Sequence, residues 1–221
     1  MDQHANAFIF DLNGTMIDDM GYHITAWHHL LNAELGANLS HEQVKSHMYG
    51  KNSELLIRVF GEDHFTEEEM DHLSLEKEKR YQQAFKEHLT LIKGLPGLLE
   101  QAYKNNIVMG IGSAAIPFNI DFVLDNLHIR HYFKAIVSAD DVKHSKPDPE
   151  TYIKAANLLQ IPPQDCIVFE DAPKGVEAAL NAGMNCVAIT TMHSPAEFEN
   201  YPNILQFISD YTDPWLQGFF R

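Results

Sequence analysis

The sequence predicts an α/β protein with a doubly wound, Rossmann-like parallel sheet that is interrupted by an inserted block of helices. From residue 91 onward, short apolar runs alternate with segments of helical periodicity, which is typical of parallel strands joined by helices. Between the first apolar run, Ala7–Phe10, and residue 88, apolar positions recur only at helical spacing. We therefore expect a discontinuous core of residues 1–16 and 89–221, and an α-helical cap domain of residues 17–88.

The expected core begins with Ala7–Phe10, an apolar run typical of a strand buried on both faces. The run stops at Asp11, and Asn13-Gly14 is a strong turn-forming dipeptide. Later strands are expected, in chain order, at Ile107–Gly112, Ala135–Val137, Cys166–Phe169, Asn185–Thr190 and Ile204–Ile208. The helices between them are expected at Pro96–Lys104, Asn119–Leu127, Pro149–Leu159 and Pro173–Asn181.

The cap is expected to consist of helices only. In chain order they are Tyr22–Leu35, a helix opened by Ser40 with Gln43, Asn52–Phe60, and a long helix from Thr66 to about His88. Gly36 is a good C-terminal cap for the first helix. Thr66 and Glu69 have the spacing of a capping box, as do the two residues that open the second helix.

The composition excludes some classes of binding partner and indicates the cellular compartment. The 221 residues carry a formal net charge of −15, which argues against nucleic acid and anionic membrane surfaces as partners. No apolar run approaches the ~18 residues that span a membrane, and we expect no secretory leader. Cys166 and Cys186 lie in apolar runs and are interpreted as buried hydrophobic residues. We expect a cytoplasmic monomer or weak oligomer, whose anionic ligand would need a local cation.

Polar residues stand where several predicted strands end. They are Asp11, Ser113, the loop residue Lys146, and the pair Glu170-Asp171. Adjacent parallel strands deliver their carboxyl ends to one crevice. Three carboxylates gathered there would repel one another by about 4 kcal/mol per pair at 4 Å and an effective dielectric of about 20. Mg²⁺ would relieve this repulsion, because it prefers carboxylates, waters and phosphate oxygens as ligands.

Four ordered motifs carry a family resemblance. They are Asp11-Leu-Asn-Gly-Thr15, Gly112-Ser113, Ser145-Lys-Pro-Asp-Pro149 and Phe169-Glu-Asp-Ala-Pro-Lys-Gly175. In this order they resemble the motifs of the haloacid dehalogenase superfamily, and the helical insertion lies where that superfamily has its α-helical cap. Within it, Tyr22-His23-Ile-Thr-Ala26-Trp27 and Lys77 resemble the β-phosphoglucomutase and sugar-phosphate phosphatase group. The resemblance covers essentially the whole chain.

The resemblance implies a role for each matching residue. Asp11 would be the nucleophile that accepts the phosphoryl group as an aspartyl phosphate, while Ser113 and Lys146 would bind the oxygens of that group. The implied Mg²⁺ ligands are Asp11, the backbone carbonyl of Asn13, Glu170 and Asp171. The implied substrate contacts from the cap are His23, Lys51 and Lys77.

The sequence departs from the family pattern at three places. Asn13 stands where the phosphotransferases have a second aspartate as general acid/base, and an amide cannot shuttle a proton. Loss of that proton transfer typically lowers a rate by about 10²–10⁴-fold. Ala115 and Ile116 replace the serine and lysine with which a mutase grips the far phosphate. Ser53 replaces a cap arginine, although Lys51 lies close by in the sequence.

These departures order the functional hypotheses. We expect a Mg²⁺-dependent phosphatase that acts on a small phosphorylated metabolite of the sugar phosphate type and is slow because of Asn13. The first alternative is a phosphohexomutase of the β-phosphoglucomutase type that uses the same aspartyl phosphate. The second is a catalytically weak protein that binds a phosphorylated metabolite without turnover. Dehalogenase or phosphonatase chemistry ranks last, because those relatives carry other signatures.

Overall fold

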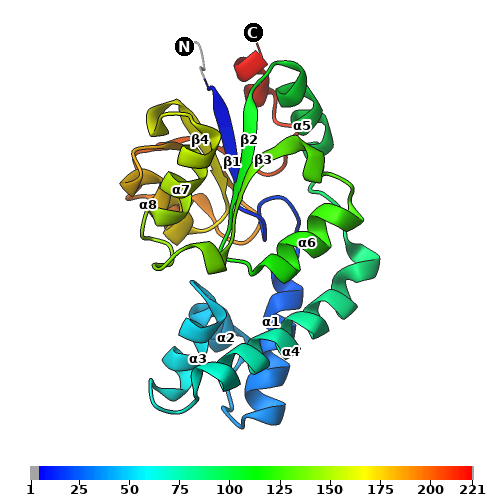
Figure 1. The fold of residues 1–221 in the computed structure, drawn as a ribbon, viewed down its shortest axis with the longest axis vertical. Coiled ribbons are helices and arrows are strands. Elements are labelled where there is room, and N and C mark those ends of the chain that lie inside the picture. Colours follow the sequence, from blue (N-terminus) through cyan, green and yellow to red (C-terminus); the bar gives the residue numbers. More distant parts are fainter. Residues whose placement is uncertain (1–4, 221) are drawn as a thin grey trace. The chain divides into compact units, whose positions relative to one another are not determined.

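The computed structural model describes residues 5–220 (Figure 1). The chain forms two compact units: a sheet unit, made of the residues up to Asp18 and from Thr90 onward, and a helical unit of Asp19–Leu89. Both boundaries fall slightly later than the positions 16/17 and 88/89 expected from the sequence. The first does so because Ile17 forms a backbone bridge with Leu91, which keeps residue 17 in the sheet unit.

The sheet unit is built on six parallel strands. In chain order they are β1 (Ala7–Phe10), β2 (Val108–Gly112), β3 (Phe133–Val137), β4 (Cys166–Glu170), β5 (Asn185–Ile189) and β6 (Ile204–Ile208). Their spatial order is β3-β2-β1-β4-β5-β6, and every adjacent pair is parallel. The chain runs outward from β1 to β3 and then returns to the other side of β1. The topological switch point therefore lies between β1 and β4.

Four helices connect these strands. They are α5 (Leu95–Lys104), α6 (Pro117–Asn126), α7 (Glu150–Leu159) and α8 (Pro173–Asn181). Because side chains alternate along a strand, β1 contributes to two faces. Ile9 joins residues of α7 and α8 in one buried cluster. Phe8 points to the opposite face, where its ring centroid lies 5.1 Å from that of Phe219. The predicted doubly wound sheet is confirmed.

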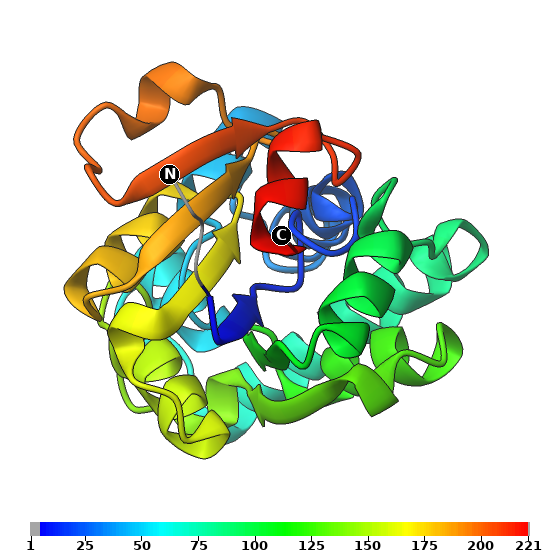
Figure 2. The ribbon, with the colours of Figure 1, turned by 90° about the horizontal axis from the view of Figure 1, so that it is seen from above.

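The segment after β6 was not predicted from the sequence. Pro214–Phe220 forms a 3₁₀ helix, in which Leu216 and Phe219 are buried. Figure 2 shows this C-terminal segment (red) beside the first strand (blue), in agreement with the contact between Phe8 and Phe219. A short 3₁₀ helix has no 3.6-residue periodicity, so its apolar residues give no helical signal.

The helical unit contains α1 (Met20–His29), α2 (His41–His47), α3 (Asn52–Phe60) and α4 (Glu67–Phe85). The capping boxes predicted at Ser40 and Thr66 are both present. Its core is formed by Trp27, Leu30, Leu31, Val44, Leu55 and Leu56. No helix within residues 5–220 has the length and apolar character to cross a membrane.

One helix of this unit differs from its prediction. The helix expected to continue to Leu35 changes into a π-helix at Leu30–Glu34. There the Asn32 side chain donates to the Leu39 carbonyl at 2.8 Å and accepts from the Leu39 N–H at 2.7 Å. This local bonding does not alter the apolar periodicity, so the sequence pattern could not indicate it.

Gly94 provides a test of the packing between α5 and the C-terminal segment. Its φ is +86°, and a Cβ there would lie 2.5 Å from the backbone carbon of Tyr211. Gly94→Ala should therefore lower the free energy of unfolding by roughly 2–4 kcal/mol. The matched control is Gly97→Ala, because Gly97 lies in α5 with open space around it. It should stabilise the protein by about 1 kcal/mol. Urea unfolding measures both, and equal midpoints would contradict the packing described.

Candidate active site

Lys146 lies at the centre of a buried group of charges in the sheet unit. Its ammonium is 2.8 Å from Asp11 Oδ1 and 2.7 Å from Glu170 Oε1. Asp11 follows β1 and Glu170 ends β4, and the register of these adjacent strands pairs Phe10 with Phe169. The two carboxylates therefore emerge at the same edge of the sheet, at the switch point. All three charged side chains are buried.

Glu170 is held by four protein donors. Oε1 accepts hydrogen bonds from the Lys146 ammonium and from the Tyr152 hydroxyl, at 2.7 and 2.8 Å. Oε2 accepts from the backbone N–H groups of Asp171 and Ala172, both at 2.9 Å. A carboxylate has about four lone-pair sites, so these donors fill the capacity of Glu170.

Two glycines leave space for the carboxylates of Asp171 and Glu170. Asp171 Oδ1 accepts a hydrogen bond from Thr15 Oγ1 at 3.2 Å. Gly14 has a φ of +73°, and a Cβ at this position would overlap with the Asp171 carboxylate. A Cβ at Gly175 would overlap with the carboxylate of Glu170. Larger residues at either glycine would displace the charged group.

Burial and charge together set the protonation of this group. Burial raises the pKa of Asp11 to about 6, although Lys146 acts against it. Burial, followed by the charges of Glu170 and Asp11, raises the pKa of Asp171 well above its usual value. For Lys146, burial alone would lower the pKa, but Asp11 and Glu170 outweigh it and raise the pKa.

This donor set fits a hard divalent cation. Asp11, Glu170 and Asp171 are buried, and Lys146 forms ion pairs with the first two, so one ammonium faces three carboxylates when all are ionised. Burial, and after it the charges of Glu170 and Asp11, raises the pKa of Asp171, so a cation beside it would favour its ionised form. Buried carboxylate oxygens are also the ligands that Mg²⁺ prefers.

Ser113 and Asn13 complete the residues predicted for the sheet unit. Ser113 directly follows β2, and its hydroxyl hydrogen-bonds to Asp11 while accepting from the Ala115 N–H at 3.1 Å. Asn13 is half-buried on the turn after β1, and its backbone bridges to Ile17. The structure thus brings Asp11, Ser113, Lys146, Glu170 and Asp171 together.

The residues predicted for substrate contact lie in the helical unit. Lys77 Nζ is 2.7 Å from His23 Nδ1 and 2.9 Å from Glu78 Oε1, and all three side chains are buried. Burial lowers the pKa of Lys77, although Glu78 opposes this. Lys51 is half-buried and immediately precedes α3, and its N–H donates to Glu54 at 3.0 Å. His23 and Lys77 therefore contact each other.

Several residues that take part in these two groups were not predicted, and Glu78 is one of them. In the sheet unit they are Thr15 and Tyr152. In the helical unit, Asp19 lies 3.2 Å from His23 Nε2 and accepts a hydrogen bond from Tyr81 at 2.5 Å. The i,i+4 spacing of Asp19 and His23 was an available signal. Tyr152 had none, because it occupies a core-facing position of an amphipathic helix.

A second group of metal-binding residue types lies on the surface of the sheet unit. His144, Asp148 and Glu150 place one potential ligand atom each within 4.8 Å of the others. Glu150 Oε2 accepts from the N–H groups of Lys143 and His144, and Asp148 Oδ1 accepts from the N–H of Glu150. These bonds shape the loop before α7, which gives the group a structural explanation.

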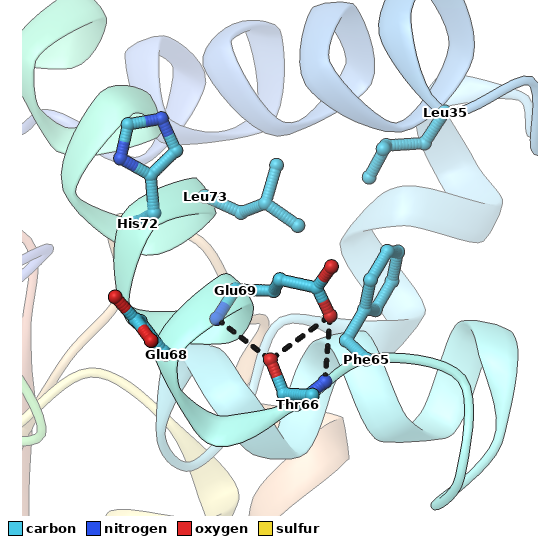
Figure 3. A pocket seen from close by; sticks show the side chains of 7 residues that line it. All are labelled: Leu35, Phe65, Thr66, Glu68, Glu69, His72 and Leu73. Carbon is cyan, nitrogen blue, oxygen red and sulfur yellow. Dashed lines mark hydrogen bonds between the residues drawn. The ribbon is translucent and has the colours of Figure 1, made fainter.

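The helical unit also contains a pocket of about 540 Å³ (Figure 3). It is lined by Leu35, Phe65, Thr66, Glu68, Glu69, His72 and Leu73. Thr66 and Glu69 bond to each other as the capping box of α4, as the dashed lines in Figure 3 show. Their polar groups thus have a structural role at the start of this helix.

Comparisons with known proteins identify the family of the chain. Residues 8–189 match the family described as haloacid dehalogenase-like hydrolase. The chain belongs to this family. Its relatives include a β-phosphoglucomutase of Bacillus subtilis, which is 32% identical over 83% of this chain and 82% of the relative. A fructose-1-phosphate phosphatase of Escherichia coli is 30% identical over 82% of this chain and 94% of the relative.

Solved structures of the family have the same fold. A β-phosphoglucomutase from Clostridium difficile superposes with a TM-score of 0.81 at 30% identity, covering 94% of this chain and 92% of that one. A family IA hydrolase from Entamoeba histolytica superposes with a TM-score of 0.83 at 27% identity, covering 93% of both chains. The family resemblance and the fold class inferred from the sequence are confirmed.

Tyr152→Phe tests the hydrogen bonding of Glu170. The variant keeps the buried ring but removes one of the four donors, so unfolding free energy should fall by about 1–3 kcal/mol. Tyr132→Phe is the matched control, because the Tyr132 hydroxyl also donates to a glutamate, Glu100 at 2.9 Å, but the side chain of this glutamate is 46% exposed. It should change stability by less than about 0.5 kcal/mol. Urea unfolding measures both variants. Similar losses of unfolding free energy would contradict the claim that the buried hydrogen bond to Glu170 contributes more to stability than the one to Glu100.

Proposed function

We propose that this protein is a Mg²⁺-dependent phosphatase that hydrolyses a phosphate ester of a small, sugar-like metabolite through a phosphorylated Asp11. The observation that carries the proposal is the contact of a buried lysine with two carboxylates at the switch point of the sheet. An electrophilic, anionic substrate would find there both a nucleophile and positive charge. The fructose-1-phosphate phosphatase and the β-phosphoglucomutase among the relatives support the substrate class.

In this proposal, each residue of the sheet unit has a defined task. A carboxylate oxygen of Asp11 attacks phosphorus, the bond to the ester oxygen breaks, and the leaving oxygen takes a proton from a water molecule. Water then attacks the phosphorus of the aspartyl phosphate, which releases inorganic phosphate and restores Asp11. Lys146 and Ser113 balance the charge of the phosphoryl oxygens in both steps. Bound Mg²⁺ would add positive charge at the same oxygens.

The metal would be held by Asp11, Asp171 and the backbone carbonyl of Asn13. Glu170 has a different task in this proposal, because its lone pairs are filled by protein donors. We assign it the role of holding Lys146 in place beside Asp11. This assignment changes the ligand set expected from the family resemblance, which included Glu170.

Asn13 determines how fast the proposed reaction can run. Its amide can orient a water molecule or a leaving oxygen, but it cannot take or give a proton at neutral pH. Proton transfer would then fall to water, so we expect slow turnover and not its complete loss. A protein that binds phosphorylated metabolites without turnover is the alternative that Asn13 favours.

Ala115 and Ile116 favour hydrolysis over a mutase reaction. A mutase must hold a bisphosphate at both ends and therefore needs a second cationic site. These two residues lie between Ser113 and the start of α6, are half-buried, and offer no charge. A phosphatase needs only the phosphate site at Asp11, so it tolerates apolar side chains there.

The metal assignment predicts a pH-dependent stabilisation. Mg²⁺ at a hundredfold excess over its Kd should stabilise the protein by about 2.7 kcal/mol, or roughly 5–10 °C in Tm. Since the metal binds Asp11 and Asp171 in their ionised forms, the shift should weaken as pH falls through their raised pKa values, which are about 6 for Asp11 and well above the usual value for Asp171. Asp171→Asn should abolish the shift at pH 7.5. Calorimetry on both proteins tests this, and an unchanged shift in the variant would refute the site.

The catalytic assignment predicts that Asn13→Asp is the faster enzyme. Assayed with hexose monophosphates and Mg²⁺, it should raise kcat by about 10²–10⁴-fold and leave KM within a small factor. Because Asn13-Gly14 is prone to deamidation, peptide mass spectrometry must first show that the parent is intact. If the variant is no faster than an intact parent, the proposed acid/base role of residue 13 is wrong.

The same assay separates the three functions. Release of inorganic phosphate without interconversion of β-glucose 1-phosphate and glucose 6-phosphate, even with bisphosphate primer, supports the phosphatase. Efficient interconversion with negligible phosphate release identifies the mutase. Binding of phosphate esters with no turnover in either protein identifies the binding protein.

A further inference from the structure

The C-terminal segment reaches the loop that carries the nucleophile. Tyr211 lies beyond residues 8–189, the part that matches the family, and is buried. Its hydroxyl donates to the Thr15 carbonyl at 2.9 Å, and its N–H donates to the Lys93 carbonyl at 2.9 Å. Tyr211 thus hydrogen-bonds both to the segment that follows β1, at Thr15, and to the segment that re-enters the sheet unit, at Lys93.

Thr15 connects this contact to the carboxylates. Its side chain is buried, and Oγ1 donates to Asp171 Oδ1 at 3.2 Å. The backbone carbonyl and the side-chain hydroxyl of Thr15 therefore bind Tyr211 and Asp171, respectively. The ring of Tyr211 is packed near Phe10 and Phe169, with centroid distances of 6.4 and 5.8 Å, and these two residues lie at the carboxyl ends of β1 and β4.

The contact is specific to a tyrosine. The ring is buried and lies near two other aromatic rings, so packing holds it in place independently of the hydroxyl. Removing only the hydroxyl would leave the buried Thr15 carbonyl without this donor. The turn from Asn13 to Thr15 could then relax, and Asp171 would lose the fixed position of its hydrogen-bond donor.

We propose that Tyr211 is a positioning residue, which fixes Thr15 and through it the metal-binding carboxylate of Asp171. This inference rests on the metal site of the proposed function. It makes the C-terminal segment part of the active site without any contact between that segment and substrate. Outer contacts of this kind commonly change metal affinity by about 10–100-fold.

Isothermal titration with Mg²⁺ tests the proposal, since it needs no substrate and no turnover. Tyr211→Phe and Thr15→Val should each weaken Mg²⁺ binding about tenfold. Because both act on one chain of contacts, the double variant should bind about as weakly as either single variant, not about a hundredfold more weakly than the parent. Thr15→Ser, which keeps the hydroxyl, should restore the parent affinity.

The control is Tyr201→Phe, because the Tyr201 hydroxyl is 3.5 Å from Glu177 in the same unit, away from this chain of contacts. It should leave Mg²⁺ affinity unchanged. Parent-like affinity in a folded Tyr211→Phe, or independent effects in the double variant, would overturn the proposal. A parent that binds no Mg²⁺ overturns both the proposal and the metal site. A parent that binds Mg²⁺ but hydrolyses nothing refutes only the phosphatase, and the titrations still decide the role of Tyr211.

Discussion

Three buried carboxylates gather at the ends of β1 and β4, two of them in contact with one buried lysine, and much of the sheet unit is needed to keep them there. Each ionised carboxylate that leaves water needs a counter-charge or several hydrogen bonds. Lys146 supplies the charge to Asp11 and Glu170. Gly14 and Gly175 supply the space, since a methyl group at either position would overlap with a carboxylate. The parallel register of β1 and β4 then sets the spacing at which these groups meet.

Support for this group comes from both faces of the sheet. Tyr152 belongs to the cluster that Ile9 forms with α7 and α8, and its hydroxyl donates to Glu170. Tyr211 lies on the face of Phe10 and Phe169, and its hydroxyl donates to the loop that carries Asp171's partner, Thr15. Both tyrosines thus have a buried ring in an apolar layer and a hydroxyl group that hydrogen-bonds to Glu170 or to its neighbouring loop at Thr15. Packing in the hydrophobic core therefore helps to fix the positions of hydrogen-bond donors to the polar site.

The sequence was sufficient for the strands and for most of the charged residues, because both follow simple rules. Apolar runs such as Ala7–Phe10 are buried on both faces, and polar residues at strand ends meet in parallel sheets. It was insufficient for Tyr152 and Tyr211, whose positions are those of ordinary core residues. The direction of their hydroxyl groups depends on tertiary packing, which leaves no trace in periodicity. The π-helical turn at Leu30–Glu34 was missed for a related reason, since it changes the hydrogen bonding but not the apolar pattern.

At Asn13, in the turn after β1, the requirements of folding and those of the proposed catalysis can be considered separately. Its neighbours Asp11, Leu12, Gly14 and Thr15 are buried, whereas Asn13 is only half-buried. The turn is fixed by those neighbours, so residue 13 can change from acid to amide without a cost in packing. In the proposed site, an aspartate there would add a fourth carboxylate to a group that already has more negative than positive charge. An asparagine avoids that repulsion and gives up proton transfer. On this argument, an aspartate at position 13 would speed the proposed reaction but lower the stability of the folded, metal-free protein.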